Sequence, residues 1–175
     1  MKILSFGAST SSTSINRQFA RYAAGLIPNA SITDLDLSDY DLPIYSSDEE
    51  EANGIPAAAK AFLAEIKSHD ALVVSLAEHN GSYSAAFKNL YDWASRAENK
   101  VWAGKPMLLL STSPGGRGGA TVLATAKETF PRMGADLKAS FSLASFYDAF
   151  DSEKGVTDSM QLELLRNAAA QLAAS

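Results

Sequence analysis

Short apolar segments alternate with longer segments of helical periodicity along the whole chain. Three apolar segments are compact and bounded by Asp, Gly or Pro, which is typical of strands buried on both faces of a sheet. They are KILSF (2–6), ALVVSLA (71–77) and PMLLLSTS (106–113). Two further segments, residues 31–37 and 135–143, alternate apolar with polar residues and therefore suit strands nearer the sheet edges.

The segments between these strands predict five helices. They cover residues 15–26, 56–67, 84–96, 120–131 and 158–173. Alternation of strands and helices favours parallel strands, because each helical crossover must return the chain to the same end of the sheet. The pattern therefore predicts an α/β fold, a three-layer doubly wound sheet of five parallel strands. No repeat or linker divides the 175 residues, and we expect a single domain over residues 1–175.

Composition and charge exclude several classes of partner. The chain has 20 acidic and 15 basic residues and a formal net charge of −5, so it offers no positive field to nucleic acid or to an anionic membrane surface. It has no cysteine, which excludes disulfides, thiolate metal sites and cysteine nucleophiles. It also lacks a secretory signal and any run near the roughly 20 apolar residues of a membrane span. We expect a cytoplasmic protein that binds neither nucleic acid nor membrane.

One segment of the chain is strongly acidic. Residues 29–59 contain no Lys or Arg, while carboxylates accumulate between Asp34 and Glu51. A solvated acidic loop is the simplest interpretation. The alternative is that this segment forms a wall of the binding site or of a subunit contact.

The loop after the first strand is rich in hydroxyl groups. Six of them follow one another from Ser9 to Ser14, and Asn16 and Arg17 come next. Ligands of open parallel sheets bind beyond the carboxyl ends of the strands, and the helix that begins here presents free N–H groups and the positive end of its dipole. The lysine-containing P-loop and the GxGxxG fingerprint are both absent. The loop predicts a site for one terminal phosphate monoester, although Ser14 alone would explain a simple helix cap.

The same opening resembles that of small esterases whose loop serine is a nucleophile. Ser9 would then need a histidine base near the C-terminus, in an Asp-x-x-His pattern. The only histidines are His69 and His79, and Ile66 and Leu76 stand three residues before them. The esterase interpretation is therefore set aside.

Two more loops can reach the same ligand. Residues 77–82 (AEHNGS) follow the third strand and residues 111–120 (STSPGGRGGA) follow the fourth. Parallel strands bring both loops to the same end of the sheet as the hydroxyl-rich loop. Glycines let backbone N–H groups approach a flat ligand closely. We expect the three loops to converge on one ligand.

Four motifs stand in order along the chain. The matching residues are Ser9, Ser14, Asn16 and Arg17; then Leu42, Pro43, Tyr45 and Asp48; then Glu78, Asn80, Ser82, Lys88, Asn89, Asp92 and Trp93; and last Ser113, Pro114, Gly115, Gly118 and Gly119. With these motifs the chain resembles, over nearly its whole length, the NAD(P)H-dependent FMN reductases and quinone reductases of the flavodoxin-like fold. It departs from the family pattern at Ala8, Ser11, Ala77, His79, Ser84 and Ala85.

The resemblance implies an oxidoreductase that binds FMN, uses NAD(P)H as co-substrate and passes a hydride to a small-molecule acceptor such as a quinone, azo or nitro compound. FMN carries this chemistry, so the resemblance implies no catalytic side chain and no metal. It implies a homodimer or homotetramer. The cofactor-binding residues that it implies are Ser9, Ser11, Ser14, Ile15, Asn16, Arg17, Glu78, His79, Asn80, Gly81, Ser113, Pro114, Gly115 and Gly118.

In this arrangement the FMN phosphate would lie in the first loop and the flavin ring between the second and third. Because Ser11 replaces the family's usual basic residue, Arg17 is the only cation expected near the phosphate. The glycine-rich turn with Arg117 would stabilise negative charge on the reduced flavin. Trp93 is expected in the core or in a subunit contact, and His79 in an exposed loop. Two alternatives stay open: a non-catalytic FMN-binding electron carrier, and a protein of this fold that has lost the flavin.

Overall fold

The computed structural model describes residues 1–175 and contains one five-stranded sheet in which all strands are parallel. Its order is β2-β1-β3-β6-β7. The strands are β1 (Lys2–Gly7), β2 (Ser31–Asp34), β3 (Ala71–Leu76), β6 (Pro106–Thr112) and β7 (Asp136–Leu143). The apolar segments form the three inner strands and the alternating segments form the two edges, as predicted. This strand order is that of flavodoxin-like sheets, which confirms the fold class.

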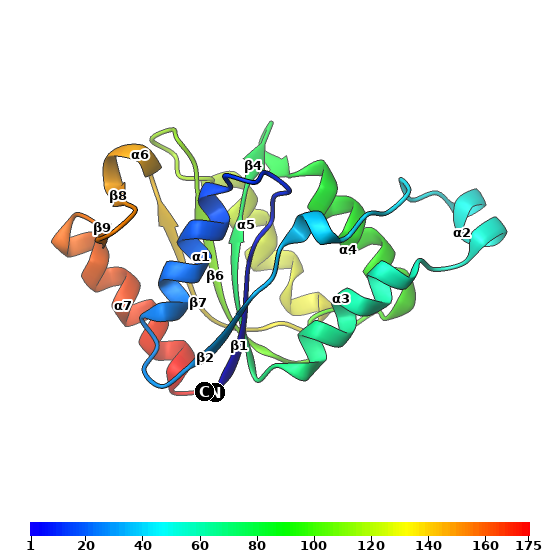
Figure 1. Ribbon diagram of the computed structural model, residues 1–175, viewed down its shortest axis with the longest axis horizontal. Helices are drawn as coiled ribbons and strands as arrows, with labels where there is room; N and C mark the ends of the chain where they lie inside the picture. Colours follow the sequence, from blue (N-terminus) through cyan, green and yellow to red (C-terminus); the bar gives the residue numbers. More distant parts are fainter.

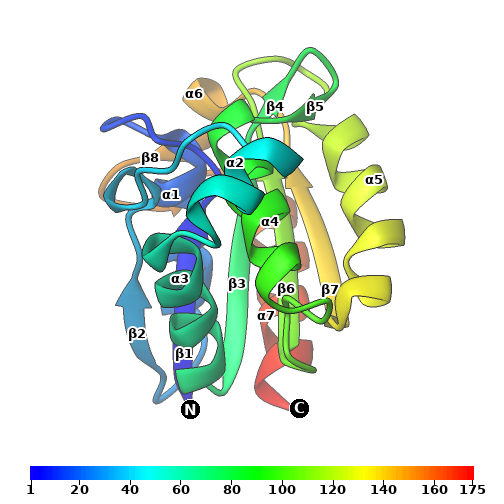
Figure 2. The ribbon, with the colours of Figure 1, turned by 90° about the vertical axis from the view of Figure 1, so that its right-hand side faces the viewer.

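Helices cover both faces of the sheet (Figures 1 and 2). The helices are α1 (Ile15–Gly25) and α7 (Ser159–Ala173) on one face, and α3 (Ala57–Ser68), α4 (Ala85–Ala97) and α5 (Ala120–Thr129) on the other. All five predicted helices are present, and their ends lie within two residues of the predicted ones. Both chain termini lie at the end of the sheet opposite the loops that follow the strands (Figure 1).

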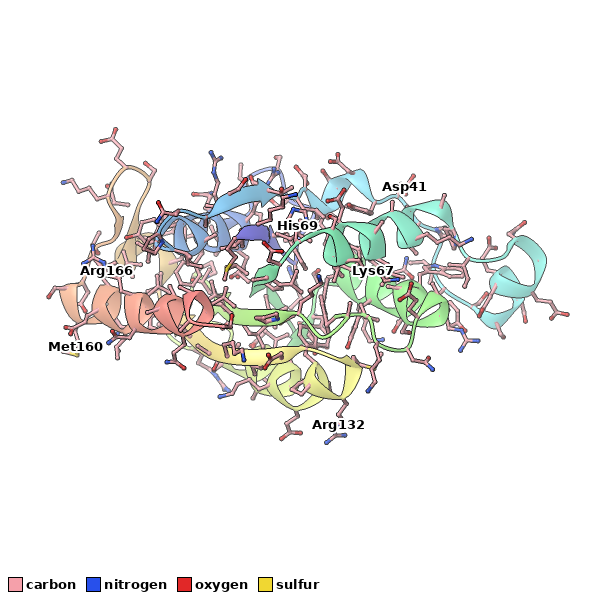
Figure 3. The ribbon with its side chains drawn as sticks, turned by 90° about the horizontal axis from the view of Figure 1, so that it is seen from below. Asp41, Lys67, His69, Arg132, Met160 and Arg166 are labelled. Atoms are coloured by element: carbon pink, nitrogen blue, oxygen red, sulfur yellow. The ribbon has the colours of Figure 1, made fainter.

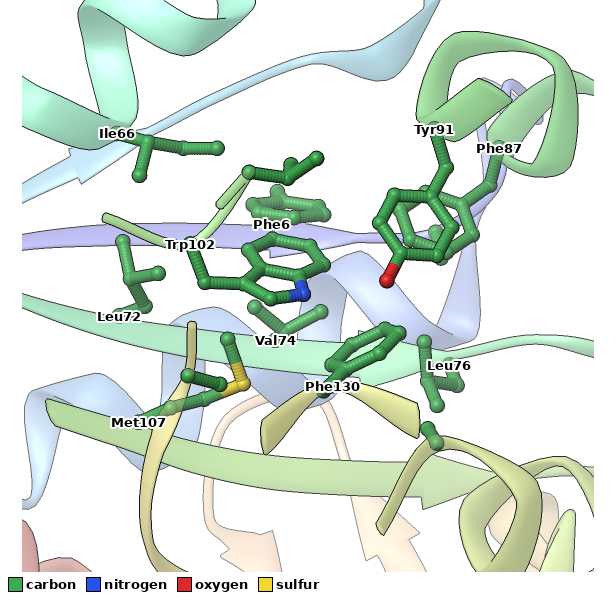
Figure 4. Packing of buried hydrophobic residues seen from close by; sticks show 14 of the residues in the cluster. Phe6, Ile66, Leu72, Val74, Leu76, Phe87, Tyr91, Trp102, Met107 and Phe130 are labelled. Carbon is green, nitrogen blue, oxygen red and sulfur yellow. The ribbon is translucent and has the colours of Figure 1, made fainter. Parts of the chain in front are cut away.

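The two faces are packed in different ways. Between the sheet and α3, α4 and α5 lies a cluster of aromatic rings, in which the centroids of Trp102 and Phe130 are 4.5 Å apart (Figure 4). Burial in this cluster raises the pKa of Tyr91 to about 12. On the other face the helices α1 and α7 contribute mainly small residues, among them Ala23 and Ala169. Small residues let these two helices approach the sheet closely.

The acidic segment is more ordered than a solvated loop. Strand β2 ends at Asp34 because Asp36 caps the short turn η1 (Leu37–Asp39), where its Oδ1 accepts the Ser38 N–H at 2.9 Å. A helix, α2 (Ser47–Asn53), then begins at the capping residue Ser46. Helix α2 buries no residue and protrudes from the body of the molecule (Figure 1). Capping hydrogen bonds therefore specify both turns, and η1 in addition buries Leu37 in the core.

Several short elements were not predicted from the sequence. They are the hairpin of β4 (Glu78–His79) and β5 (Ser82–Tyr83), the turn η2 (Pro131–Met133), the helix α6 (Phe146–Ala149), and the hairpin of β8 (Phe150–Asp151) and β9 (Gly155–Val156). Elements of two to four residues are too short to show periodicity. No helix of the structure is both long and apolar enough to cross a bilayer.

The two histidines lie at opposite ends of the molecule. His69 precedes β3 and is seen from the end where the strands begin (Figure 3). It is buried, with Nε2 2.8 Å from the Thr33 hydroxyl and Nδ1 2.7 Å from the Glu65 carbonyl. His79 follows β3 and is exposed. His69 therefore has a structural role far from the candidate site.

Candidate functional site

The loops after β1, β3 and β6 meet around one cavity of about 210 Å³. Nine residues of the predicted site line it: Ser9, Ser11, Ser14, Ile15, Asn16, Glu78, His79, Ser113 and Pro114. Thr13, Ala77, Thr112 and Tyr147 complete the lining. The other five predicted residues do not line it: Arg17, Asn80, Gly81, Gly115 and Gly118. Residues that are far apart in the sequence thus form one polar pocket beyond the carboxyl ends of the strands.

The first turn of α1 forms one end of the cavity. Ser14 caps the helix, and its hydroxyl accepts the Arg17 N–H at 3.1 Å. The N–H groups of Ile15 and Asn16 have no acceptor within the protein, as expected for the first residues of a helix. Gly7 makes this arrangement possible, because a Cβ there would lie against the backbone nitrogen of Arg17 and 2.7 Å from its Cα. The turn therefore offers free donors close to the end of β1.

Asn16 ties this turn to the neighbouring strands. Its Oδ1 accepts the Ser75 hydroxyl at 2.7 Å and the Thr112 N–H at 3.1 Å, while its Nδ2 donates to the Thr112 carbonyl at 3.1 Å. The side chain is 3% exposed, so all three bonds are shielded from water. Asn16 thus joins α1 to the ends of β3 and β6 with its side chain, and only its backbone N–H is free to bind a ligand.

The structure does not bring the Arg17 side chain into the cavity. Its Nε lies 3.2 Å from both carboxylate oxygens of Asp34, and its Nη1 pairs with Asp36. The hydrogen bond to Asp34 raises the pKa of Arg17 above its usual value. Hydrogen bonds from the Ser38 hydroxyl and N–H, with the charge of Arg17 added, lower the pKa of Asp36. The guanidinium expected near the phosphate is instead engaged by carboxylates beside β2.

The β4–β5 hairpin forms the second wall. Glu78 caps α5 from outside the helix, since its Oε2 accepts the Val122 N–H at 2.9 Å. Asn80 and Gly81 form the hairpin tip with φ of 51° and 73°, the backbone conformation of a tight type I′ turn. His79 is exposed and lines the cavity from this hairpin. Asn80 and Gly81 therefore form a tight turn at the tip of the hairpin, and neither residue lines the cavity.

The loop between β6 and α5 forms the third wall. The Gly118 carbonyl accepts the Ser111 hydroxyl at 2.7 Å and the Ser142 hydroxyl at 2.9 Å. Gly118 has a φ of 58°, which favours glycine. The N–H groups of Gly115 and Gly116 have no acceptor in the protein. These glycines leave backbone donors uncovered, whereas Arg117 donates to the Thr121 hydroxyl at 3.1 Å and does not line the cavity.

The Leu-Pro-x-Tyr motif lies outside the cavity and docks on α4. The Pro43 carbonyl accepts from Trp93 Nε1 at 2.8 Å and from Asn89 Nδ2 at 2.9 Å. The rings of Tyr45 and Trp93 meet edge to face at 5.0 Å. Trp93 was expected in the core or in a subunit contact, and it is fully buried within the chain and belongs to the core.

Sequence reasoning missed some residues that line or shape the site. Thr112 ends β6, and its hydroxyl donates to the Leu143 carbonyl at 2.7 Å. Tyr147 comes from α6, directly after β7, and is exposed at the cavity. The parallel topology contains the signal for Tyr147, because the loop after the fifth strand must also reach this end of the sheet. No local sequence pattern identifies Thr112 as a residue of the site.

The fold and the cavity define a flavodoxin-like protein with a polar, donor-rich pocket beyond the carboxyl ends of its strands. The family described as NADPH-dependent FMN reductase matches residues 1–148, and the chain belongs to that family. It is thus an FMN-dependent oxidoreductase that uses NAD(P)H. Residues beyond the match include α7, which packs on β6 and β7.

Similar proteins cover nearly the whole chain. An NAD(P)H-dependent FMN reductase of Pseudomonas aeruginosa is 31% identical over 169 residues, which is 95% of this chain and 90% of that protein. An NADPH:quinone oxidoreductase of Arabidopsis thaliana is 30% identical over 178 residues, covering 95% and 87%. Among solved structures, the flavoenzyme NAD(P)H:(acceptor) oxidoreductase FerB of Paracoccus denitrificans has a TM-score of 0.78 at 26% identity, covering 99% and 95%.

The residues present fit FMN. Free N–H groups at the start of α1, with the hydroxyls of Ser9 and Ser11, match a phosphate that needs several donors. The uncovered N–H groups of Gly115 and Gly116 suit the polar edge of a flat ring.

Proposed function

We propose that the whole chain, residues 1–175, is one flavin-binding domain that passes a hydride from NAD(P)H through FMN to a quinone, azo, nitro or similar acceptor. The observation that carries this proposal is the convergence of three strand-end loops on one cavity, with unpaired N–H donors at one end. Relatives named quinone reductase and quinone oxidoreductase support a quinone as acceptor. The finding of several reductases among the relatives favours an enzyme over a non-catalytic carrier.

Each loop has a separate task in this proposal. The N–H groups of Ile15 and Asn16, with the hydroxyls of Ser9, Ser11 and Ser14, hold the phosphate. Glu78 and His79 bound the ring on one side, supported by the turn at Asn80 and Gly81. Ser113, Pro114 and Gly115 bound it on the other, and Gly118 keeps that loop in place. FMN, when bound, supplies the hydride chemistry.

The protein's own contribution is to bind and orient. The cavity lining contains no nucleophile with a histidine base, because the only histidine there, His79, is exposed and makes no hydrogen bond to a lining serine. Uncovered N–H groups of the glycine-rich loop would stabilise negative charge on the reduced ring, since a fixed donor needs no reorganisation. Arg117 does not line the cavity and donates to the Thr121 hydroxyl, so the proposal rests on these backbone N–H groups.

We also propose a homodimer or homotetramer located in the cytoplasm. Helix α2 buries none of its residues, and Ile44 beside it is 78% exposed. A short helix of this kind gains little stability alone, and a second copy would cover it. Light scattering on the purified protein tests this: a monomeric mass would contradict the oligomer.

The decisive experiment combines a spectrum with turnover. We expect the protein to bind FMN with a flavin absorbance band and to oxidise NADPH or NADH faster when a benzoquinone is present. An electron carrier would bind FMN but leave the pyridine nucleotide unoxidised. A protein that stays colourless and fails to quench added FMN fluorescence would have lost the flavin, and the proposal would be wrong.

A further inference from the structure

The cavity that would receive the flavin phosphate has no lysine or arginine in its lining. The residues at its α1 end are the hydroxyl side chains of Ser9, Ser11, Thr13 and Ser14 with the backbone of Ile15. His79, on the opposite wall, is the only lining side chain able to carry a positive charge. A phosphate dianion placed here would therefore meet dipoles and hydrogen-bond donors rather than a fixed cation.

The two arginines of α1 belong to another cluster. Arg17 is paired with Asp34 and Asp36, and Arg21 lies 4.0 Å from Asp34. Two guanidinium groups and two carboxylates leave this cluster without net charge. It lines a second hollow of about 200 Å³, which Ser12 and Ser14 of the hydroxyl-rich loop also line, on the side of α1 that faces β2. A neutral cluster projects little field into the cavity.

The donors at the cavity are well defined by the backbone. Arg17 N–H is already bound by the Ser14 hydroxyl, and Ser14 N–H by the Ser11 carbonyl at 3.0 Å. This leaves the N–H groups of Ile15 and Asn16 at the positive end of the helix dipole. Bonds from such groups to a phosphate are charge-assisted and stronger than neutral ones.

We propose, resting on the proposed function, that this chain binds the FMN phosphate without any cationic side chain. Arg17 instead pairs with Asp34 and Asp36, which ties α1 to the β2 side of the sheet and stabilises the fold. The salt dependence of FMN binding distinguishes this binding mode from ion pairing. The protein carries a net charge of −5, so added salt screens repulsion of the phosphate and no attractive pair is lost.

The first test compares FMN with riboflavin, which lacks the phosphate. Quenching of flavin fluorescence gives both dissociation constants from about 20 mM to about 500 mM NaCl, a range in which the Debye length falls from about 20 Å to about 4 Å. We expect the dissociation constant of FMN to change by less than about twofold over this range, or to fall. The Ser11→Arg variant, which introduces a cation, should tighten FMN at low salt and lose that gain at high salt, with riboflavin unchanged. A wild-type FMN affinity that weakens steeply with salt would overturn the proposal.

The second test removes one backbone donor. Ile15 is the first residue of α1, where proline is tolerated because its missing N–H has no helical acceptor. Ile15→Pro should weaken FMN about tenfold, as for one charge-assisted hydrogen bond, and leave riboflavin unchanged. Ile15→Ala keeps the N–H and is the matched control. Equal FMN affinity in the two variants would contradict a phosphate bound by this donor.

The third test concerns the charged residues. Arg17→Gln and Asp36→Asn break the same cluster from opposite sides, and we expect both to lower the thermal midpoint and to preserve the ratio of FMN to riboflavin affinity. His79→Gln should preserve this ratio too. If Arg17→Gln or His79→Gln weakens FMN but not riboflavin, that side chain binds the phosphate and the proposal is wrong. If neither flavin binds the wild-type protein, it is the proposed function that fails.

Discussion

The loops after β1 and β6 face the same cavity, but they are held in place by different means. The first is held by side chains, above all by the buried amide of Asn16 with its three hydrogen bonds. The second is held through its backbone, where the Gly118 carbonyl accepts two hydroxyl groups from neighbouring strands. The first loop should therefore be sensitive to lost hydrogen bonds, and the second to an added Cβ.

The difference matches what each loop has to present. A phosphate can be surrounded by hydroxyls and helix N–H groups, so polar side chains can both build the first loop and bind the ligand. A flat ring needs backbone that comes close without side chains in the way, so the second loop uses glycine. Three substitutions, each with a control variant, and a pH titration test how far this division holds.

The largest effect is expected at the base of the first loop, where it depends on a missing side chain. In Gly7→Ala the new Cβ would lie against the backbone of Arg17, which cannot move without displacing α1. We expect a loss of about 3 kcal/mol in the free energy of unfolding, measured with urea, together with weaker FMN binding. Gly25→Ala, at the other end of α1, has no atom within 4 Å of its Cβ and is the control. Equal stability of the two variants would refute the close contact.

Removing the amide of Asn16 should have the next largest effect. Asn16→Ala leaves the Ser75 hydroxyl and both backbone groups of Thr112 without their partner in a buried place. Unsatisfied buried groups cost about 1–3 kcal/mol, and we expect a loss of about 2–3 kcal/mol in urea denaturation. Ser75→Ala removes only one of the bonds and should cost about 1 kcal/mol. A smaller loss for Asn16→Ala than for Ser75→Ala would show that side chains do not hold this loop.

Gly118→Ala tests whether the second loop, after β6, is equally sensitive to an added Cβ. Its positive φ and the Leu143 carbonyl, 2.9 Å from the position of a Cβ, both oppose a side chain. We expect a loss of about 2 kcal/mol. Gly116→Ala, in the same loop with open space around it, should change stability by less than about 0.5 kcal/mol. If both alanines are tolerated equally, the backbone of this loop is freer than its hydrogen bonds indicate.

The smallest effect is expected on the way that the stability of the protein depends on pH. Hydrogen bonds from Ser38 and the charge of Arg17 lower the pKa of Asp36 in the folded protein. The stability from this group is therefore complete above the unfolded pKa, about 3.9 for Asp, and is lost as the pH falls through the lower folded value. Asp36→Asn should reduce the slope of stability against pH below about pH 4. An unchanged acid slope would show that Asp36 does not stabilise the first loop through its charge.

The sequence predicted much of the fold because its signals are local. Alternation of apolar and helical segments specified five strands and five helices, and parallel topology then placed the three loops together. Nine predicted site residues line the cavity for this reason. The turns of the acidic segment were missed because each depends on one capping side chain, such as Asp36 or Ser46.

The positions of individual side chains could not be predicted from the sequence. Arg17 follows the hydroxyl-rich loop directly, and its neighbours in the chain gave no sign that it turns away from the cavity. Asp34 and Asp36 bind it because β2 lies beside β1, and only the assembled sheet creates that contact. Tyr147 likewise reaches the cavity only once β7 is in place at the edge of the sheet.

The amino-acid sequence by itself determined the layered fold, the family and the end of the sheet at which the cavity forms, because periodicity and short motifs are properties of neighbouring residues. The tertiary structure alone decided which donors remain free and which charges are already paired. Hydrogen bonds and ion pairs act over a few ångströms in space, and most partners of the site residues are tens of positions away along the chain.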